Sequence, residues 1–187
     1  MRQLLRSILI RSVMVSRGRA EAYKLWATLQ TEYERHQEAI RAMNGSKELP
    51  LQTALKVQDD LRRYFCLRSA GFLEQVTFEV LHEYLRSKSS GPVHEFASSY
   101  FRHSPNLNAE AFVGLVTRFG TGHSERVNHF ISAERKDALD TLLEVRNLVA
   151  HGLEIGGAKL SPDPHFKLCR EIYDWLVEEF LDDVAAK

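Results

Sequence analysis

The chain has 187 residues, of which 44% are hydrophobic and 27% charged, a composition ordinary for one soluble globular domain. Lys and Arg together number 25, as do Asp and Glu, so the formal net charge at pH 7 is +0. This composition excludes a mainly disordered chain, and without an overall positive field any nucleic-acid contact must depend on a local basic patch.

The first 19 residues, MRQLLRSILIRSVMVSRGR, contain five arginines and no acidic residue. Stretches of this kind occur in organelle transit peptides and in helices that lie on membranes. A basic tail that docks on the domain, on a partner or on RNA is the alternative that we favour. A secretory signal is not favoured, because Arg6 and Arg11 interrupt the apolar segment. No apolar run reaches the roughly 20 residues of a membrane-spanning helix.

Helical periodicity dominates the rest of the chain, and strand alternation is hard to find. A first helix is predicted over 20–43, where Leu25, Leu29 and Tyr33 recur every fourth residue, and the segment NGSKELP ends it. A longer helix is predicted from Leu51 to about Ser87. Residues 69–71 are the place where it could bend, because glycine costs about 1 kcal/mol relative to alanine within a helix.

Shorter helices are predicted after SSGP, beginning at PVHEF, at NAEAF with Asn108 as the N-cap, and at SERVN. A helix over about 135–152 and a last amphipathic helix beginning at His165 are separated by a Gly- and Pro-containing loop. The sequence therefore predicts an all-α protein with a single helical domain over 20–187, preceded by the basic segment 1–19.

No metal or cofactor site is predicted. Cys66 and Cys169 lie far apart without CxxC or Cys/His spacing, and the histidines show no HExxH arrangement. We expect two ordinary buried thiols in a reducing compartment, and hence a cytoplasmic protein.

The segment LDTLLEVRNLVAHGLEIGG, residues 139–157, places an arginine in an apolar helix pattern. At about 100° per residue, the expected apolar stripe contains Leu139, Leu142, Leu143, Val149, Ala150 and Leu153. Arg146 falls near the centre of this stripe, and Asn147 and His151 lie one turn apart along its edge.

An arginine keeps its charge at physiological pH, so unpaired burial of Arg146 would cost several kcal/mol at least. An ion pair within the chain would avoid this cost, with Glu74, Glu79 or Glu144 as the candidate acid. Alternatively, the guanidinium lines a polar cleft between two subunits and binds a phosphate there.

The segments RNLVAHG (146–152) and LRSAGFLEQVTFEVLHEYL (67–85) resemble the HEPN superfamily, most closely its RiboL-PSP-type branch. The resemblance covers about 50–185 and leaves the helix over 20–43 as an N-terminal helical extension. It implies an antiparallel four-helix bundle with additional short helices, which forms a homodimer with two motifs facing each other across a cleft. It also implies metal-independent endoribonuclease activity, in a toxin or phage-defence setting with a possible protein antitoxin or regulator.

RNA cleavage without a metal requires a base, an acid and positive charge near the phosphate. His151 can serve as acid or base, Arg146 can stabilise the phosphate, and Asn147 can orient either of them. Glu74 and Glu144 are supporting candidates. Leu153 occupies the position at which toxins paired with a nucleotidyltransferase-type antitoxin usually carry a tyrosine, which argues against modification by such an antitoxin.

Three alternatives stay open. In the first alternative, Arg146 forms a structural ion pair, and His151 is a cation at the end of a helix that Gly152 terminates. The protein is a noncatalytic dimeric module that binds RNA, a nucleotide or a protein partner. Finally, the basic N-terminus makes the protein a targeted or membrane-associated scaffold.

Overall fold

The computed structural model describes residues 16–45, 48–99, 107–153 and 160–182, and within them the regular structure is entirely helical. The helices are α2 (Arg17–Gly45), α3 (Leu51–Lys88), α4 (Gly91–Ser99), α5 (Ala109–Thr117), α6 (Thr121–Phe130), α7 (Ala133–Ala150) and α8 (Pro162–Leu181). The predicted all-α class is confirmed. Most of the basic segment 1–19 lies outside the described residues.

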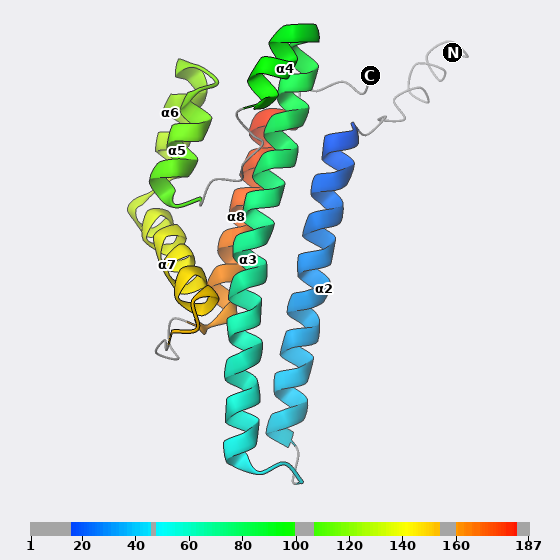
Figure 1. The fold of residues 1–187 in the computed structure, drawn as a ribbon, viewed down its shortest axis with the longest axis vertical. Helices are drawn as coiled ribbons and strands as arrows, with labels where there is room; N and C mark the ends of the chain where they lie inside the picture. Colours follow the sequence, from blue (N-terminus) through cyan, green and yellow to red (C-terminus); the bar gives the residue numbers. More distant parts are fainter. Residues whose placement is uncertain (1–15, 46–47, 100–106, 154–159, 183–187) are drawn as a thin grey trace, which may run out of the picture.

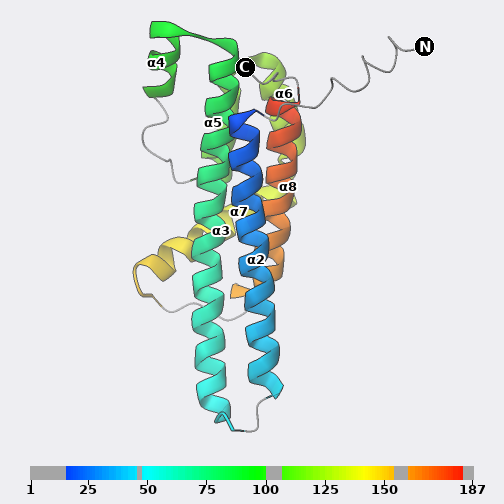
Figure 2. The same cartoon turned by 90° about the vertical axis from the view of Figure 1, so that its right-hand side faces the viewer.

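Helices α2 and α3 form a long antiparallel hairpin, and α8 lies beside both (Figure 1). Helix α8 runs in the same direction as α3, while α7 crosses α3 and α8 obliquely (Figure 2). The short helices α5 and α6 pack together next to α7, and α4 folds back along the end of α3. The turn end of the α2–α3 hairpin projects beyond α7 and α8.

Helix α2 contributes residues to the hydrophobic core. Its buried residues include Ala22, Trp26 and Leu29, which share one face of the helix. The Trp26 ring stacks on two aromatic rings of α8, with centroid distances of 5.2 Å to Phe166 and 5.5 Å to Tyr173. The predicted helix over 20–43 therefore packs against α3 and α8.

Helix α3 continues without interruption through residues 69–71, so the predicted place for a bend is not a helix end. Ser69 and Ala70 are buried, and the Cys169 thiol of α8 donates to the Ser69 carbonyl oxygen at 3.6 Å. The central part of α3 is buried against α8. This burial stabilises the helix by more than the cost of about 1 kcal/mol that Gly71 carries within a helix.

Local signals define several helix ends. Asn108 caps α5 as predicted, since its side-chain oxygen accepts from the Ala111 N–H at 2.7 Å. Ser132 does the same for α7, accepting from the Arg135 N–H at 3.4 Å. In the described part of the chain, no helix is both long and apolar enough to cross a membrane.

Candidate functional site

The buried face of α7 is rotated relative to the stripe expected from the sequence. Leu139, Leu142 and Val145 are the buried residues of this helix, whereas Ala150 and Leu153 are exposed. At about 100° per residue, Leu142 lies at the centre of this buried face, and about 40° from it lies the only partly buried Arg146. Its side chain is 31% exposed, which removes most of the desolvation cost that a central position would carry.

Arg146 has two polar contacts that bear on its role. Its Nη1 donates to Asn147 Oδ1 at 2.9 Å, and its Nη2 lies 3.8 Å from Glu74 Oε1 on α3. The second distance is too long for a hydrogen bond, so Glu74 offsets the charge of Arg146 without fixing its geometry. Of the other two acids considered, Glu79 is half-buried on α3 and Glu144 is exposed on α7.

His151 lies at the C-cap of α7, at the exposed end of the helix. Gly152 follows with a φ of 69°, its N–H donates to the Val149 carbonyl, and the Leu153 N–H donates to the Leu148 carbonyl. This pair of bonds is a Schellman motif, in which a left-handed residue ends the helix. The glycine of RNLVAHG therefore has a structural explanation, and the turn presents the imidazole to solvent.

Arg146 and His151 point in different directions. They are five positions apart, which corresponds to a rotation of about 140° and a rise of about 7.5 Å along an α-helix. Asn147 joins them, because its Oδ1 accepts from Arg146 and its main-chain oxygen accepts from the His151 N–H at 3.1 Å. The structure thus brings Arg146, Asn147 and Glu74 together, and places His151 beside this group on another side of the helix.

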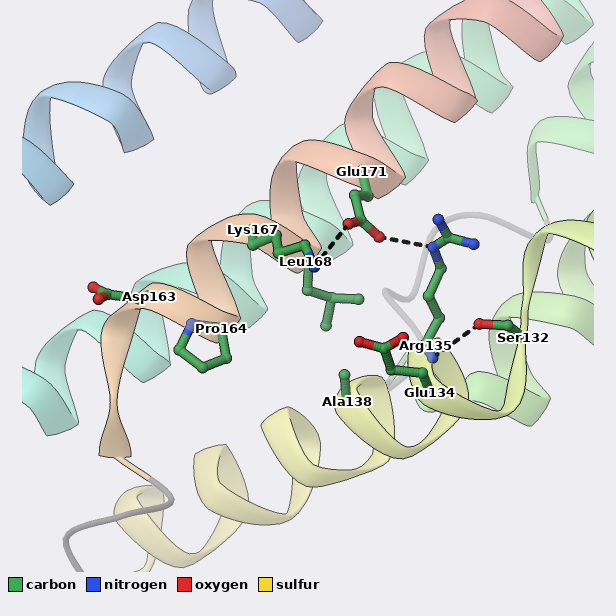
Figure 3. A pocket seen from close by; sticks show the side chains of 9 residues that line it. All are labelled: Ser132, Glu134, Arg135, Ala138, Asp163, Pro164, Lys167, Leu168 and Glu171. Atoms are coloured by element: carbon green, nitrogen blue, oxygen red, sulfur yellow. Dashed lines mark hydrogen bonds and ion pairs between the residues drawn. The ribbon is translucent and has the colours of Figure 1, made fainter.

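Glu74 also lines a pocket of about 300 Å³ between α2 and α3. The other lining residues are Glu21, Leu25, Gly71, Gln75, Phe78 and Glu79. A second pocket, of about 570 Å³, lies between the first half of α7 and α8 (Figure 3). There Glu171 pairs with Arg135 at 2.7 Å and with Lys167 at 3.7 Å, and no predicted site residue reaches this pocket.

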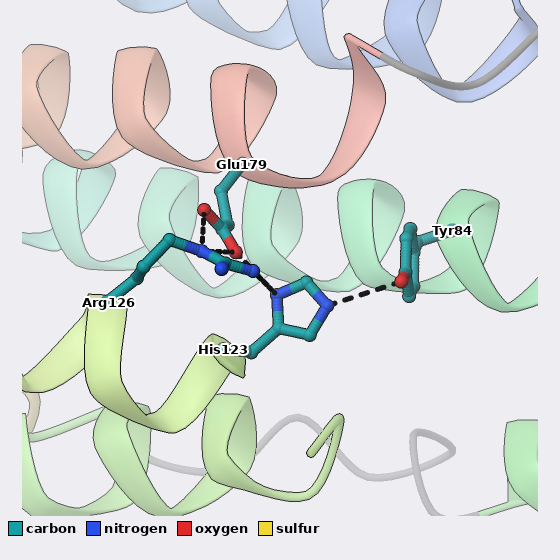
Figure 4. Close-up of polar contacts among 4 residues, drawn as sticks. All are labelled: Tyr84, His123, Arg126 and Glu179. Atoms are coloured by element: carbon teal, nitrogen blue, oxygen red, sulfur yellow. Dashed lines mark hydrogen bonds and ion pairs between the residues drawn. The ribbon is translucent and has the colours of Figure 1, made fainter. Parts of the chain in front are cut away.

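A polar cluster that the sequence did not reveal joins α3, α6 and α8 (Figure 4). Glu179, only 10% exposed, accepts from Arg126 Nε at 2.6 and 2.7 Å and contacts His123 Nδ1. The other ring nitrogen of His123 lies 3.2 Å from the Tyr84 hydroxyl, and the ring stacks on Phe180. The spacing of His123 and Arg126 places them on one helix face, but nothing local indicates that Glu179 is their partner.

Among the described residues, no group of three or more His, Cys, Asp and Glu side chains is arranged to hold a metal ion. Burial raises the pKa of the Cys66 thiol to about 12 and also raises that of Cys169. Both thiols are free and buried, as the sequence predicted.

Comparison with known protein families gives one match. The family model for RiboL-PSP-HEPN matches residues 32–185, which begins inside α2 and ends just beyond α8. No individual curated protein and no solved structure matches the chain. The match includes the second part of α2, the whole of α3, α7 and α8, and the whole RNLVAHG segment. The chain therefore belongs to the RiboL-PSP-HEPN family.

Proposed function

We propose that this protein is a metal-independent endoribonuclease, with His151 as acid or base and Arg146 as the phosphate-binding residue. Membership of the HEPN family indicates an RNA-related, ribonuclease-like function. The observation that carries the more specific proposal is the end of α7. A partly exposed guanidinium and an exposed imidazole lie within five residues there. The side chain of Asn147 accepts from the guanidinium, and its main-chain oxygen accepts from the main-chain N–H of His151.

The proposed reaction is an internal transesterification. The 2′-hydroxyl oxygen attacks the phosphorus and gives its proton to a base, while the 5′ oxygen leaves and takes a proton from an acid. An imidazole can perform either transfer near neutral pH. The Arg146 guanidinium stabilises the charge that develops on the phosphate oxygens. The products are a 2′,3′-cyclic phosphate and a 5′-hydroxyl.

A homodimer would complete this site. Within one chain, Arg146 faces α3 and His151 projects to another side of α7, so both side chains do not converge on one phosphate. An isologous dimer repeats each residue about a two-fold axis. Such an axis near the end of α7 would bring Arg146 of one copy opposite the partner's His151. We therefore place the reacting phosphate between the two subunits.

The test is RNA cleavage by the purified protein in the presence of EDTA. We expect cleavage with cyclic-phosphate ends, and a loss of about 100-fold or more in His151→Ala and Arg146→Ala. Arg170→Ala is the matched control, because Arg170 forms an exposed pair with Asp174 on α8 at 3.6 Å. Full activity in a correctly folded His151→Ala protein would refute the assignment.

A noncatalytic module that binds RNA, a nucleotide or a protein partner is the second candidate. The observation that favours it is that Gly152 and His151 also form an ordinary helix end, and that Glu74 already contacts Arg146. RNA binding without cleavage in the same assay would select this function.

A toxin or phage-defence role, with a protein antitoxin or regulator, is the biological setting we propose for the enzyme. Growth arrest on expression of the wild-type chain, absent for His151→Ala, would support this setting. Equal growth of both strains with active enzyme present would argue against it.

A further inference from the structure

We infer that Arg63 of α3 is a second phosphate-binding residue of the same site, and that it holds an RNA phosphate next to the one that reacts. This inference rests on the proposed function, because it assigns a substrate contact at the end of α7. Arg63 lies on the part of α3 that passes this end, and its Nη1 donates to the Leu153 carbonyl oxygen at 3.2 Å. Leu153 is two residues after His151, so Arg63 is anchored to the turn that follows this histidine.

Arg63 differs from three other arginines near it in the structure, because their charges are offset by carboxylates. Arg62 pairs with Asp59 at 3.2 Å, Arg68 pairs with Glu32 at 2.8 Å, and Arg146 has Glu74 at 3.8 Å. Within the described residues, no carboxylate forms an ion pair with Arg63, and its bond to Leu153 is to a neutral carbonyl. Arg63 therefore supplies full positive charge close to His151.

The geometry leaves donors available on Arg63. A guanidinium carries five N–H donors, and the carbonyl of Leu153 uses one of them. The side chain is half-buried and its bond to Leu153 is solvent-exposed, so a ligand can approach it. Anchoring by one donor also reduces the side-chain entropy that a phosphate contact would otherwise cost.

The position of Arg63 also suits a strand that passes the helix end. Arg146 projects toward Glu74, while Arg63 reaches the turn that follows His151. In the proposed dimer, Arg63 of the subunit that supplies His151 and Arg146 of the other subunit can therefore hold successive phosphates of a single strand. Such contacts position the substrate and carry no base specificity.

The experiment measures binding of a fluorescent single-stranded RNA to His151→Ala protein at several salt concentrations, so that cleavage cannot interfere. Adding Arg63→Gln should weaken binding roughly fivefold and reduce the slope of log Kd against log salt by about 0.7, the value for one lost phosphate contact. Arg63→Lys keeps the charge and should keep the wild-type slope. The control is Arg62→Gln, whose charge already has a partner and which should leave the slope unchanged.

A purely structural role for Arg63 predicts a different pattern. Loss of the bond to Leu153 would lower the midpoint of thermal unfolding and leave the salt slope as it was. An unchanged slope in folded Arg63→Gln, or the absence of RNA binding by the parent protein, would overturn the inference. RNA binding with the expected slope change, but no cleavage by the wild-type chain, would uphold Arg63 as a phosphate contact and refute the ribonuclease.

Discussion

At the scale of single residues, the contact between Arg146 and Glu74 sets the state of the candidate site before substrate binds. Both side chains are partly accessible, with exposed fractions of 31% and 17%, and they are 3.8 Å apart. An ion pair of this kind contributes about 0.2–1 kcal/mol. A phosphate that binds Arg146 must compete with this carboxylate, so Glu74 lowers the affinity of the site for anions.

Glu74→Gln should therefore strengthen RNA binding by up to about fivefold, because the competing charge is gone. The free energy of unfolding should fall by less than about 1 kcal/mol. Fluorescence anisotropy with a single-stranded RNA measures the first effect, and urea unfolding measures the second. Glu79→Gln is the control, since it removes a charge from the same pocket. Weaker binding by Glu74→Gln than by Glu79→Gln would show that Glu74 supports the substrate instead.

The sequence predicted the helix end of the motif better than it predicted the environment of the arginine. Gly152 as a stop and Asn108 as a cap depend on bonds within a few residues, and such bonds follow from local chemistry. The centre of the buried face of α7 depends on how α7 crosses α3 and α8. In the structure the buried face of α7 is centred on Leu142, and Arg146 lies about 40° from that centre and is only partly buried.

At the scale of helices, the start of α2 approaches α3 closely at Gly18. A Cβ atom at this position would overlap Glu83 Cβ and Cγ, which belong to the rigid base of that side chain. Gly71 of α3 differs, since an added Cβ would meet nothing within 4 Å. Replacing these two glycines with alanine should therefore change the free energy of unfolding in opposite directions.

We expect Gly18→Ala to destabilise the protein by about 1–2 kcal/mol, because overpacking exceeds the gain in helix propensity. Gly71→Ala should stabilise it by roughly 0.5–1 kcal/mol, since only the propensity changes. Urea unfolding monitored by circular dichroism distinguishes the two variants. Equal stabilisation by both would mean that α2 and α3 are not in close contact at Gly18.

Buried His36 makes the contact of α2 with α3 and α8 sensitive to pH. Burial, and then the charge of Arg62, lower the pKa of His36 below its ordinary value of 6.5. The unfolded chain therefore binds a proton more readily than the folded chain does. Above pH 6.5, His36 therefore does not reduce the free energy of unfolding. As the pH falls below 6.5, protonation of His36 in the unfolded chain lowers that free energy.

The wild-type protein should consequently be less stable at pH 5.5 than at pH 7.5, and His36→Gln should show a smaller difference. The midpoint of urea unfolding at the two pH values measures this effect. His82, whose pKa is also lowered by burial, contributes in the same direction, so a residual difference is expected in the variant. An identical pH dependence of both proteins would contradict the assignment to His36.

The cluster in Figure 4 shows what sequence patterns of helices leave undetermined. The helices of the described residues follow from apolar periodicity and from Gly, Pro and Asn at their ends, which are properties of short segments. Tyr84, His123 and Glu179 come from three elements far apart in the chain. Their meeting is set by the packing of α6 against the end of α8, and periodicity carries no information about partners across helices.

At the scale of the whole molecule, the arrangement of α7 in the bundle makes the proposed enzyme dependent on two copies of the chain. Arg146 faces α3 of its own subunit, whereas His151 projects from the exposed end of the helix. The family match covers both residues and most of the bundle around them. In our proposal, each subunit therefore supplies one of the two residues of a site.

Mixing Arg146→Ala and His151→Ala proteins tests that claim most directly. Each variant alone should be inactive. A heterodimer retains one intact pair, with the arginine from one chain and the histidine from the other. After free exchange of equal amounts, we predict RNA cleavage at about a quarter of the wild-type rate, because half of the dimers are mixed and each has one of two sites. Exchange that is confirmed by affinity tags on the two variants, without any recovery of cleavage, would contradict the account.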